Sequence, residues 1–293
     1  MTHAGILSLC GKPNAGKSTL LNRLVGQKLS IVSPKPQSTR ERVVGILTQH
    51  DAQIVLLDAP GLLDPQYALQ RAMRQTALRA LDDADVIAYL VDAHEIDPPP
   101  LAAAAMLPAP PRAPVLTVYN KVDTVDELHR AALRAAHPNA LCISALTGEG
   151  VETLLEQVRG ALPESPFLYP EDDIGTQTIR FFASELVRET ALEQLEEEVP
   201  YSIACGIEEF REDRRPVYIR AVIYVERESQ KRIVIGQRGA RIREIGRASR
   251  EKIEALIDAP VYLDLWVKVL PNWRRDPSAL RRLGFTHTEE SRP

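Results

Sequence analysis

The segment GKPNAGKSTL, residues 11–20, has the residue types and spacing of a loop that binds phosphate. A Gly, four further residues and then Gly-Lys-Ser let backbone N–H groups and a helix N-terminus surround the phosphates of a nucleotide. We expect Lys17 to reach the β- and γ-phosphates and Ser18 to offer its hydroxyl to Mg²⁺. The residues expected to contact the nucleotide from this loop are Gly11, Asn14, Ala15, Gly16, Lys17, Ser18 and Thr19.

The second candidate element is DAPG, residues 58–61, which follows an apolar run. A carboxylate at a strand end beside a phosphate loop can hold Mg²⁺, so Asp58 is the expected ligand. Gly61 lets its backbone N–H approach the γ-phosphate closely. Taken alone, Asp-x-x-Gly is more simply explained as a turn, and only the loop upstream makes it a nucleotide element.

The third element is NKVD, residues 120–123, which follows the apolar run VLTVY. Asp123 can accept hydrogen bonds from the N1–H and 2-amino groups of guanine, whereas adenine offers neither donor and would leave the carboxylate unpaired. Asn120 can serve the other edge of the base and tie its loop to the phosphate loop. Lys121 can lay its stem over the base plane. The alternative is a solvated turn. Ser144 and Ala145 complete the expected pocket, with the Ala145 N–H directed at the guanine O6.

These motifs need a sheet to position them, and the hydrophobic pattern supplies one. We expect strands at 5–10, 43–48, 53–57, 85–91, 115–119 and 140–143, and helices at 16–25, 66–81, 125–136 and 151–162. Strands alternating with helices predict an α/β, doubly wound and mostly parallel sheet. The Pro-rich insert at 98–114 confines any helix there to a short Ala-rich piece.

The pattern changes after residue 164, and we expect a domain at 1–164, a Pro-rich acidic linker at 165–176 and a second domain at 177–293. The second domain is expected to contain helices at 178–198 and 240–257 and strands at 201–209, 217–225 and 261–269, the first helix ended by Pro200. This order predicts a small α+β domain.

Composition places the chain among ordinary globular proteins. Its 293 residues, of which 44% are hydrophobic and 26% charged, suffice for two cores without disulfides. Cys10, Cys142 and Cys205 lie far apart in apolar runs, so we expect free thiols in a reducing cytoplasm. We find no signal peptide and no apolar run of membrane-spanning length, and nothing that indicates a dimer, so we expect a monomer.

The net charge of −4 conceals a basic segment at 231–252, which carries about +6. Its two acidic residues are Glu244 and Glu251, and its eight basic residues are Lys231, Arg232, Arg238, Arg241, Arg243, Arg247, Arg250 and Lys252. A basic patch on an acidic protein is compatible with a contact to a nucleic-acid backbone.

The segment also contains Gly236-Gln237-Arg238-Gly239 ahead of a basic helix. The Gly-x-x-Gly loop of KH domains clamps about four nucleotides of single-stranded RNA, and the order of elements matches the type II KH arrangement. We expect Ile235, Ile242 and Ile245 to form an apolar floor for bases. The residues expected to bind RNA are Lys231, Arg232, Ile235, Gly236, Gln237, Arg238, Gly239, Arg241 and Ile242. An ordinary solvated helix face is the alternative.

With its nucleotide motifs in this order, the N-terminal domain resembles a Ras-like P-loop GTPase. The resemblance implies a threonine that binds Mg²⁺ only when GTP is present, and we expect Thr39 in this role within the loop 33–45, with Ser38 as the alternative. Lys17, Thr39 and Asn14 are the residues expected to act in catalysis.

Leu62 stands where Ras-like enzymes often have a glutamine that orients the attacking water. An aliphatic side chain cannot hydrogen-bond, so slow intrinsic hydrolysis or another helper is expected. Asp64 is near in sequence, but nothing in the sequence positions it. The amide oxygen of Asn14 could coordinate K⁺ beside the phosphates, or Asn14 could simply tolerate a left-handed turn.

Over nearly its whole length the chain resembles the Era family of bacterial GTPases, which joins a Ras-like GTPase domain to a C-terminal type II KH domain. The matching segments are GKPNAGKST, PQSTR, DAPGLL, NKVD, VERESQKRIVIGQRGARIREIG and APVYLDLWVKVLPNW, with the tail up to LGF. Ala59 and Ser38 depart from residues that are often threonine in the family.

The resemblance implies GTP hydrolysis, binding near the 3′ end of small-subunit ribosomal RNA, a role in small-subunit assembly and partial peripheral membrane association. Three alternatives stay open from the sequence: a non-enzymatic RNA-binding protein with GTP as a structural ligand, an ATP-dependent enzyme, which Asp123 disfavours, and a GTPase with another RNA target.

Overall fold

A computed structural model describes residues 1–285, so the last eight residues of the expected second domain, 286–293, lie outside the described residues. The chain divides into two compact units. One comprises Met1–Pro65 and Met73–Thr176, and the other comprises Gln66–Ala72 and Gln177–Pro293. Each unit has its own sheet and its own apolar core.

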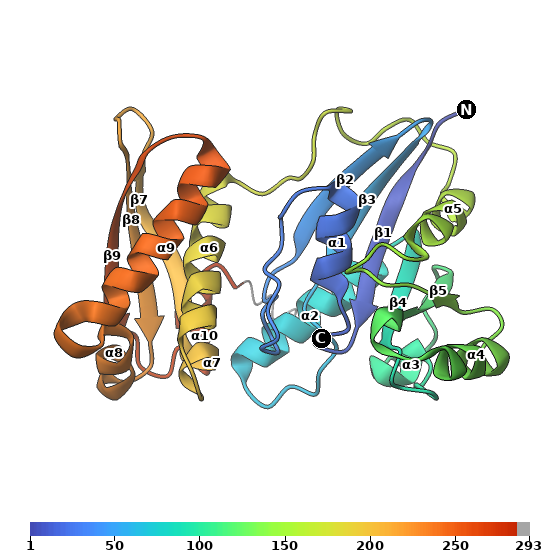
Figure 1. The fold of residues 1–293 in the computed structure, drawn as a ribbon, viewed down its shortest axis with the longest axis horizontal. Helices are drawn as coiled ribbons and strands as arrows, with labels where there is room; N and C mark the ends of the chain where they lie inside the picture. Colours follow the sequence, from blue (N-terminus) through green and yellow to red (C-terminus); the bar gives the residue numbers. More distant parts are fainter. Residues whose placement is uncertain (286–293) are drawn as a thin grey trace, which may run out of the picture. The chain divides into compact units, whose positions relative to one another are not determined.

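The elements of the first sheet and its helices follow one another as the alternating pattern predicts (Figure 1). They are β1 (His3–Gly11), α1 (Lys17–Val25), β2 (Val43–Gln49), β3 (Ala52–Asp58), α2 (Ala68–Asp82), β4 (Val86–Asp92), α3 (Leu101–Ala104), β5 (Val115–Asn120), η1 (Val122–Thr124), α4 (Glu127–Ala136), β6 (Leu141–Cys142) and α5 (Val151–Ala161).

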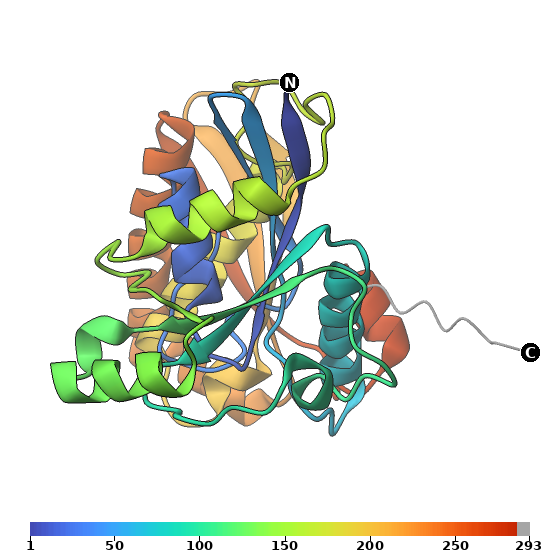
Figure 2. The same cartoon turned by 90° about the vertical axis from the view of Figure 1, so that its right-hand side faces the viewer.

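The strand order is β2-β3-β1-β4-β5-β6, and β2 alone pairs in an antiparallel way. Side chains of α2, α3 and α4 share one buried cluster with β3, β4 and β5, while α1 and α5 lie on the other side of the sheet (Figure 2). The mostly parallel, doubly wound sheet is therefore confirmed. Because parallel strands end at one edge, the loops after β1, β3, β4 and β5 meet there.

The second sheet has the order β7-β8-β9, with β7 antiparallel and β9 parallel to β8. Helices α6 and α9 pack on one face of it through a shared apolar cluster. The elements are α6 (Ile179–Gln194), α7 (Val199–Ser202), β7 (Ala204–Arg211), β8 (Val217–Val225), α8 (Glu228–Ile235), η2 (Gln237–Gly239), α9 (Ala240–Ile257), β9 (Val261–Val269) and α10 (Pro277–Arg282).

Three local expectations in the second unit were wrong or incomplete, whereas the expectation for the insert 98–114 was correct. The helix expected at 178–198 ends at Gln194, and Pro200 does not end a helix but lies in the first turn of α7, where a missing N–H costs nothing. Helix α8 precedes the Gly-x-x-Gly turn, so that turn joins two helices. The insert 98–114 holds only the four-residue α3, as its prolines predict.

The segment 165–176, expected to be a linker, belongs to the first unit. Gln53 Oε1 accepts the N–H groups of Leu168 and Tyr169 at 2.7 and 2.9 Å, and the Ile46 N–H donates to the Ile174 carbonyl at 2.9 Å. These hydrogen bonds hold the segment against β2 and β3.

The three cysteines are free thiols, with Cys10 buried and the other two half-buried. Burial raises the pKa of Cys10 to about 12, so its reactive thiolate form is suppressed. Among residues 1–285, no helix has the length and apolar character needed to cross a membrane.

Candidate functional site

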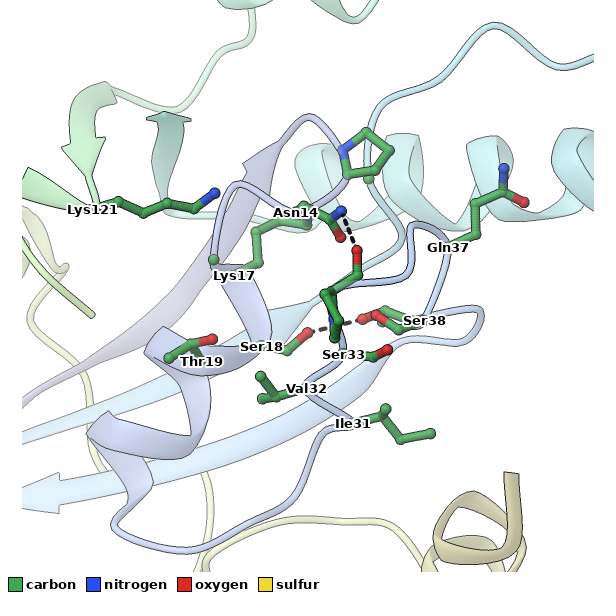
Figure 3. A pocket seen from close by; sticks show the side chains of 15 residues that line it. Asn14, Lys17, Ser18, Thr19, Ile31, Val32, Ser33, Gln37, Ser38 and Lys121 are labelled. Carbon is green, nitrogen blue, oxygen red and sulfur yellow. Dashed lines mark hydrogen bonds between the residues drawn. The ribbon is translucent and has the colours of Figure 1, made fainter. Parts of the chain in front are cut away.

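The loop between β1 and α1 has the geometry of a phosphate cradle (Figure 3). The ammonium of Lys17 folds back over the loop, donating to the carbonyls of Gly11 at 3.2 Å and Lys12 at 3.0 Å. The loop leads into the N-terminus of α1, which favours anions. Lys17 is thus held where a bound phosphate would replace the carbonyls as its partner.

Three expected metal ligands meet beside this loop, although they come from distant segments. The Ser18 hydroxyl donates to Asp58 Oδ2 at 2.7 Å and lies 2.9 Å from Thr39 Oγ1. Ser38, the alternative to Thr39, lines the same cavity, but Thr39 is the residue that contacts Ser18. The contact favours Thr39 over Ser38.

Lys17 and Asp58 are both buried, and they carry charges of opposite sign. Burial lowers the pKa of Lys17, and the nearby Asp58 carboxylate partly offsets that effect. Burial likewise raises the pKa of Asp58, partly offset by the Lys17 charge and the Ser18 hydrogen bond. Each group is costly without the other, so this corner of the site is electrostatically coupled.

The residues present fit a magnesium ion. Hydroxyl and carboxylate oxygens are the donors that Mg²⁺ prefers, and Ser18, Thr39 and Asp58 supply them within hydrogen-bond distance of one another. Asp58 Oδ1 is moreover buried without a hydrogen-bond partner among the described residues. An ion or its water shell would supply the partner that this oxygen lacks.

Close packing explains two glycines of the motifs. A Cβ added at Gly61 would lie 2.6 Å from the Pro13 backbone N, so the phosphate loop and the Asp-x-x-Gly turn touch. A Cβ at Gly16 would lie 2.0 Å from Asn120 Nδ2, and Gly16 has a left-handed φ of 96°. Larger residues at either position would push the loops apart.

Leu62 does not face the nucleotide cavity. Its side chain is buried in the core cluster with Ala77 and Leu81, while its N–H donates to the Gly11 carbonyl at 3.0 Å. Asp64 is exposed and is not among the described residues that line the cavity. Neither residue is placed to orient an attacking water.

Asn14 takes the left-handed turn conformation that its sequence position allows. Its φ of 62° is left-handed, a conformation that asparagine tolerates better than most residues. Its Nδ2 also donates to the Pro34 carbonyl at 2.9 Å, so the side chain links the phosphate loop to the loop 33–45 (Figure 3). The amide oxygen is then the atom available to a cation.

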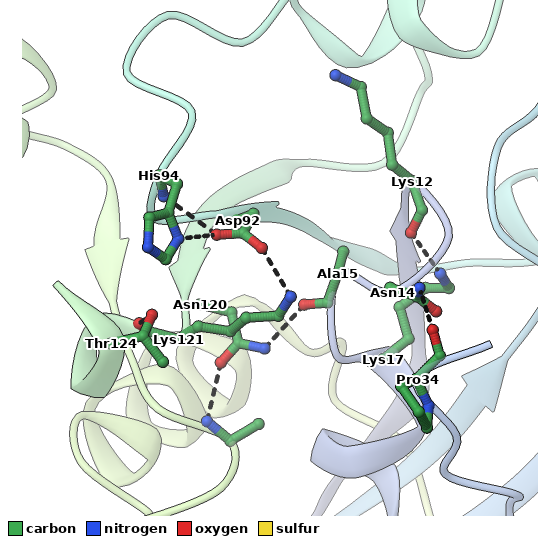
Figure 4. A network of polar contacts seen from close by, with 11 residues as sticks. Lys12, Asn14, Ala15, Lys17, Pro34, Asp92, His94, Asn120, Lys121 and Thr124 are labelled. Atoms are coloured by element: carbon green, nitrogen blue, oxygen red, sulfur yellow. Dashed lines mark hydrogen bonds and ion pairs between the residues drawn. The ribbon is translucent and has the colours of Figure 1, made fainter. Parts of the chain in front are cut away.

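Asn120 ties the base-binding loops to the phosphate loop (Figure 4). Its Nδ2 donates to the Ala15 carbonyl at 2.8 Å, and its Oδ1 accepts the Ala145 N–H at 2.8 Å. The Ala145 N–H, expected to face guanine O6, is thus engaged by Asn120 in this structure. Ser144 is buried, and its hydroxyl accepts the Thr147 N–H at 3.0 Å, closing the turn.

Lys121 and Asp123 follow β5 at the rim of the site. Lys121 has a left-handed φ of 69° and lines a cavity of about 360 Å³ together with residues of the phosphate loop and of the loop 33–45. Asp123 is exposed in the 3-10 turn η1. An exposed carboxylate there is free to receive a base edge from solvent.

Three residues of the Gly-x-x-Gly turn have left-handed backbone conformations, and the two glycines leave its backbone open to close approach by a ligand. Gly236 and Gly239 have φ values of 72° and 76°, and Arg238 between them has a φ of 50°. A Cβ at Gly236 would lie 2.8 Å from Arg241 Cβ. Gln237, Arg238 and Arg241 are exposed around the turn.

Some basic side chains of the segment 231–252 are already paired with acidic residues, so its charge count overstates the unpaired positive charge. Lys252 is bound by Glu189 at 3.1 Å and Glu193 at 2.8 Å from α6, and Arg247 is paired with Glu244 at 2.7 Å. These are ordinary ion pairs of a helix surface. By contrast, five basic residues have no acidic partner among the described residues: Lys231, Arg232, Arg238, Arg241 and Arg243.

The expected apolar floor for bases was wrong in one residue, Ile245. Ile245 is fully buried in the core of the second unit, whereas Ile235 and Ile242 are half-buried beside the turn. Ile245 therefore stabilises the fold and cannot touch a base, while Ile235 and Ile242 remain candidates.

Comparisons with known proteins match both parts of the chain. A family model for 50S ribosome-binding GTPases matches residues 6–121, and a KH domain model matches residues 198–274. GTPase Era of Carboxydothermus hydrogenoformans is 41% identical over 98% of this chain and 99% of its own length. GTPase Era of Pseudomonas aeruginosa is 43% identical over 97% of this chain and 95% of its own.

The chain belongs to the Era family of GTPases. A crystal structure of a tyrosine-to-alanine variant of Aquifex aeolicus Era bound to GDP·AlF4⁻ superimposes with a TM-score of 0.89 at 39% identity, over 98% of this chain and all of that one. Another Era structure, in complex with MgGDPNP and nucleotides 1506–1542 of 16S ribosomal RNA, gives 0.90 at 39% identity with the same coverage.

As an Era GTPase, the chain binds GTP and GDP and hydrolyses GTP. Membership confirms the Ras-like GTPase domain followed by a KH domain and removes two alternatives, the ATP-dependent enzyme and the non-enzymatic protein.

Sequence reasoning missed two residues that hold the base loops of this Era-family chain. Arg23 on α1 donates from Nε to the Ala145 carbonyl at 2.6 Å, and Asp92 at the end of β4 binds Lys121. An isolated acid at the end of an apolar strand is a weak signal for Asp92. The sequence contains no signal for the role of Arg23, because its partner Ala145 lies 122 residues away in the chain.

Proposed function

We propose that this chain is a GTP-controlled switch that binds the 3′ region of small-subunit ribosomal RNA and assists assembly of the small ribosomal subunit. The observation that carries the proposal is the Gly-x-x-Gly turn, whose left-handed glycines lie among basic residues without acidic partners in the described structure. The relative crystallised with a 16S ribosomal RNA fragment supports the choice of RNA.

In the nucleotide site, Ser18, Thr39 and Asp58 would hold Mg²⁺, and Lys17 would bind the β- and γ-phosphates. The ion would neutralise charge that develops on the phosphates during hydrolysis. Asp123 would accept two hydrogen bonds from guanine, Lys121 would cover the base and Asn120 would keep the loops together. The contacts among Ser18, Thr39 and Asp58 support this assignment.

A monovalent cation bound by Asn14 would compensate for Leu62. Leu62 lies in the core and Asn14 Nδ2 donates to Pro34, which leaves the Asn14 amide oxygen to meet K⁺. K⁺ there would supply the positive charge that an arginine supplies in related enzymes.

We expect GTP hydrolysis to be about tenfold or more faster in KCl than in NaCl of equal ionic strength. The Asn14→Gly variant separates the two roles of the residue, because glycine keeps the left-handed conformation and removes the amide. Phosphate release measured in both salts should show no K⁺ stimulation in Asn14→Gly. Equal rates in KCl and NaCl for the unmutated chain, or an undiminished K⁺ effect in the variant, would remove the cation from the proposal.

For RNA binding, Arg238 and Arg247 form a matched pair on the same basic segment. Arg238 is exposed at the turn without an acidic partner among the described residues, whereas Arg247 is paired with Glu244. We expect Arg238→Ala to weaken binding of an RNA oligonucleotide from the 3′ end of small-subunit ribosomal RNA about 5- to 30-fold, and Arg247→Ala to change it less than about twofold. Fluorescence anisotropy at fixed salt measures both.

The same titration tests the switch when it is run with a GTP analogue and with GDP. If GTP favours the RNA-binding state, RNA must favour GTP over GDP by the same factor. Equal RNA affinity in both nucleotide states would leave an RNA-binding GTPase without a switch. Equal losses in the two arginine variants would argue instead for a diffuse charge effect.

Fewer observations bear on the cellular compartment in which the protein acts. We propose that the protein acts in the cytoplasm, which the three free cysteines support. Peripheral association with the membrane is implied by the family resemblance alone.

A further inference from the structure

Asp92 is fixed beside the base-binding loop by the sheet itself. It is the last residue of β4, and the register of β4 and β5 pairs it with Asn120. The next N–H along the chain, that of Ala93, donates to the Asn120 carbonyl at 2.8 Å. Backbone hydrogen bonds therefore place the Asp92 carboxylate next to Lys121.

Both carboxylate oxygens of Asp92 are engaged (Figure 4). Oδ2 accepts from Lys121 Nζ at 2.6 Å, while Oδ1 accepts the His94 N–H at 3.1 Å and lies 2.7 Å from His94 Nδ1. Burial alone would raise the pKa of Asp92, but the hydrogen bonds from Lys121 and His94 outweigh it and lower the pKa to about 2. The carboxylate is thus charged and held in one orientation at physiological pH.

The anchored ammonium decides where the Lys121 stem lies. Lys121 lines the cavity of about 360 Å³ next to the phosphate loop, and it also lines a smaller cavity of about 110 Å³ shared with Asp92. A free lysine side chain samples many rotamers, and fixing one of them when a ligand binds costs conformational entropy. An ammonium already held at its tip has lost part of that freedom before the ligand arrives.

We propose that Asp92 is a positioning residue for guanine nucleotides: it anchors the Lys121 ammonium and so presents the Lys121 stem to the face of the base. Asp92 does not touch the nucleotide in this arrangement. The inference rests on the placement of guanine proposed above.

The expected effect is moderate, because the side chains of Asp92 and Lys121 are 34% and 35% exposed and water screens their attraction. Asp92→Asn keeps the shape of the side chain and removes its charge. We expect the dissociation constants of GDP and of a GTP analogue to rise by a similar factor of about 3 to 10, since both ligands share the base. Fluorescent nucleotide titration and displacement measure the constants and the dissociation rate.

Four comparison variants make the test specific. Lys121→Met keeps the stem without the ammonium, so Asp92→Asn should add nothing in that background. Glu95→Gln removes another ion pair of the same loop, between Glu95 and Lys12, and should change affinity less than about twofold. Glu152→Gln removes the exposed pair with Arg159 on α5 and serves as the distant control. Asp92→Glu, which restores the charge, should recover part of the affinity.

Nucleotide affinity within twofold of the unmutated chain in Asp92→Asn would overturn the proposal, as would equal losses with and without Lys121→Met. A loss in Glu95→Gln as large as that in Asp92→Asn would show that the loop was loosened as a whole. Thermal unfolding of the nucleotide-free variants should match that of the unmutated protein. If Asp123→Asn leaves the preference for guanine unchanged, the placement of the base is itself wrong; if Asp123→Asn abolishes it while Asp92→Asn has no effect, only the role of Asp92 fails.

Discussion

Lys17→Met is expected to lower GTP hydrolysis by at least a hundredfold and to weaken nucleotide binding. The ammonium is already folded over the phosphate loop at 3.0 and 3.2 Å from two carbonyls, so it needs little reorganisation to meet phosphate oxygens. Loss of one such preorganised charge typically costs 10²–10³ in rate. Multiple-turnover phosphate release with saturating GTP and Mg²⁺ measures the effect.

Lys12→Met is the matched control, since it makes the same change in the same loop. The Lys12 side chain is 54% exposed and is turned toward Glu95, away from the phosphate cradle (Figure 4). We expect hydrolysis within about twofold of the unmutated rate, because exposed ion pairs contribute little. Similar losses in both variants would mean that the loop responds to any lost charge and that Lys17 has no special role.

The same substitution has a consequence for stability, because Lys17 faces a buried carboxylate. The pKa of Asp58 is raised by burial, and removing the Lys17 charge raises it further. An acid whose folded pKa exceeds its unfolded pKa binds more protons in the folded state, so its contribution to stability falls as pH rises through that range. Without nucleotide, the free energy of unfolding of Lys17→Met should therefore fall more steeply, as the pH rises above the ordinary carboxyl pKa of 3.8, than that of the unmutated chain. Adding Asp58→Asn should remove the difference.

The motifs were predictable from the sequence because each is a local signal. Strand ends, glycines and the spacing of Lys17, Asp58 and Asp123 lie within short segments, and a parallel sheet brings its strand ends to one edge. The contact of Ser18 with Asp58 follows from that topology, whereas Thr39 was expected only from the resemblance to Ras-like GTPases. The doubly wound fold and the site at its edge were therefore available before the structure.

The direction of individual side chains and their pairing with distant residues could not be predicted from such local signals. The sequence places Lys252 in a basic patch. In the structure, Glu189 on α6 pairs with it, although the two residues are 63 positions apart in the chain. Leu62 was known to be apolar, but only its packing against α2 shows that it faces the core. Ile245 was different, because Ile245, Ser249 and Ile253 follow helical spacing and all are buried. That periodicity could have assigned Ile245 to the core.

Asp123→Asn is expected to exchange the base that the protein accepts. Asp123 presents two acceptors, which match the N1–H and 2-amino donors of guanine, whereas asparagine presents one acceptor and one donor. The amide donor then meets the 2-amino group without a partner, and sites that leave buried polar groups unpaired reject ligands by large factors. We expect GTP affinity to fall by about a hundredfold or more. Xanthosine triphosphate has a carbonyl at position 2 and should bind the variant better than GTP does.

Competition against a fluorescent guanine nucleotide provides the measurement, with four competitors that form a ladder of donors. Guanine offers both donors, inosine keeps N1–H alone, xanthosine replaces the 2-amino group by an acceptor and adenine offers neither. For the unmutated chain the affinity should fall from GTP to ITP and further to ATP, and in Asp123→Asn the order of GTP and XTP should reverse. Because Asp123 is exposed in the nucleotide-free structure, the variant should fold normally, and its thermal unfolding checks that. An unchanged order of affinities in a folded variant would place the base elsewhere on the edge of the sheet.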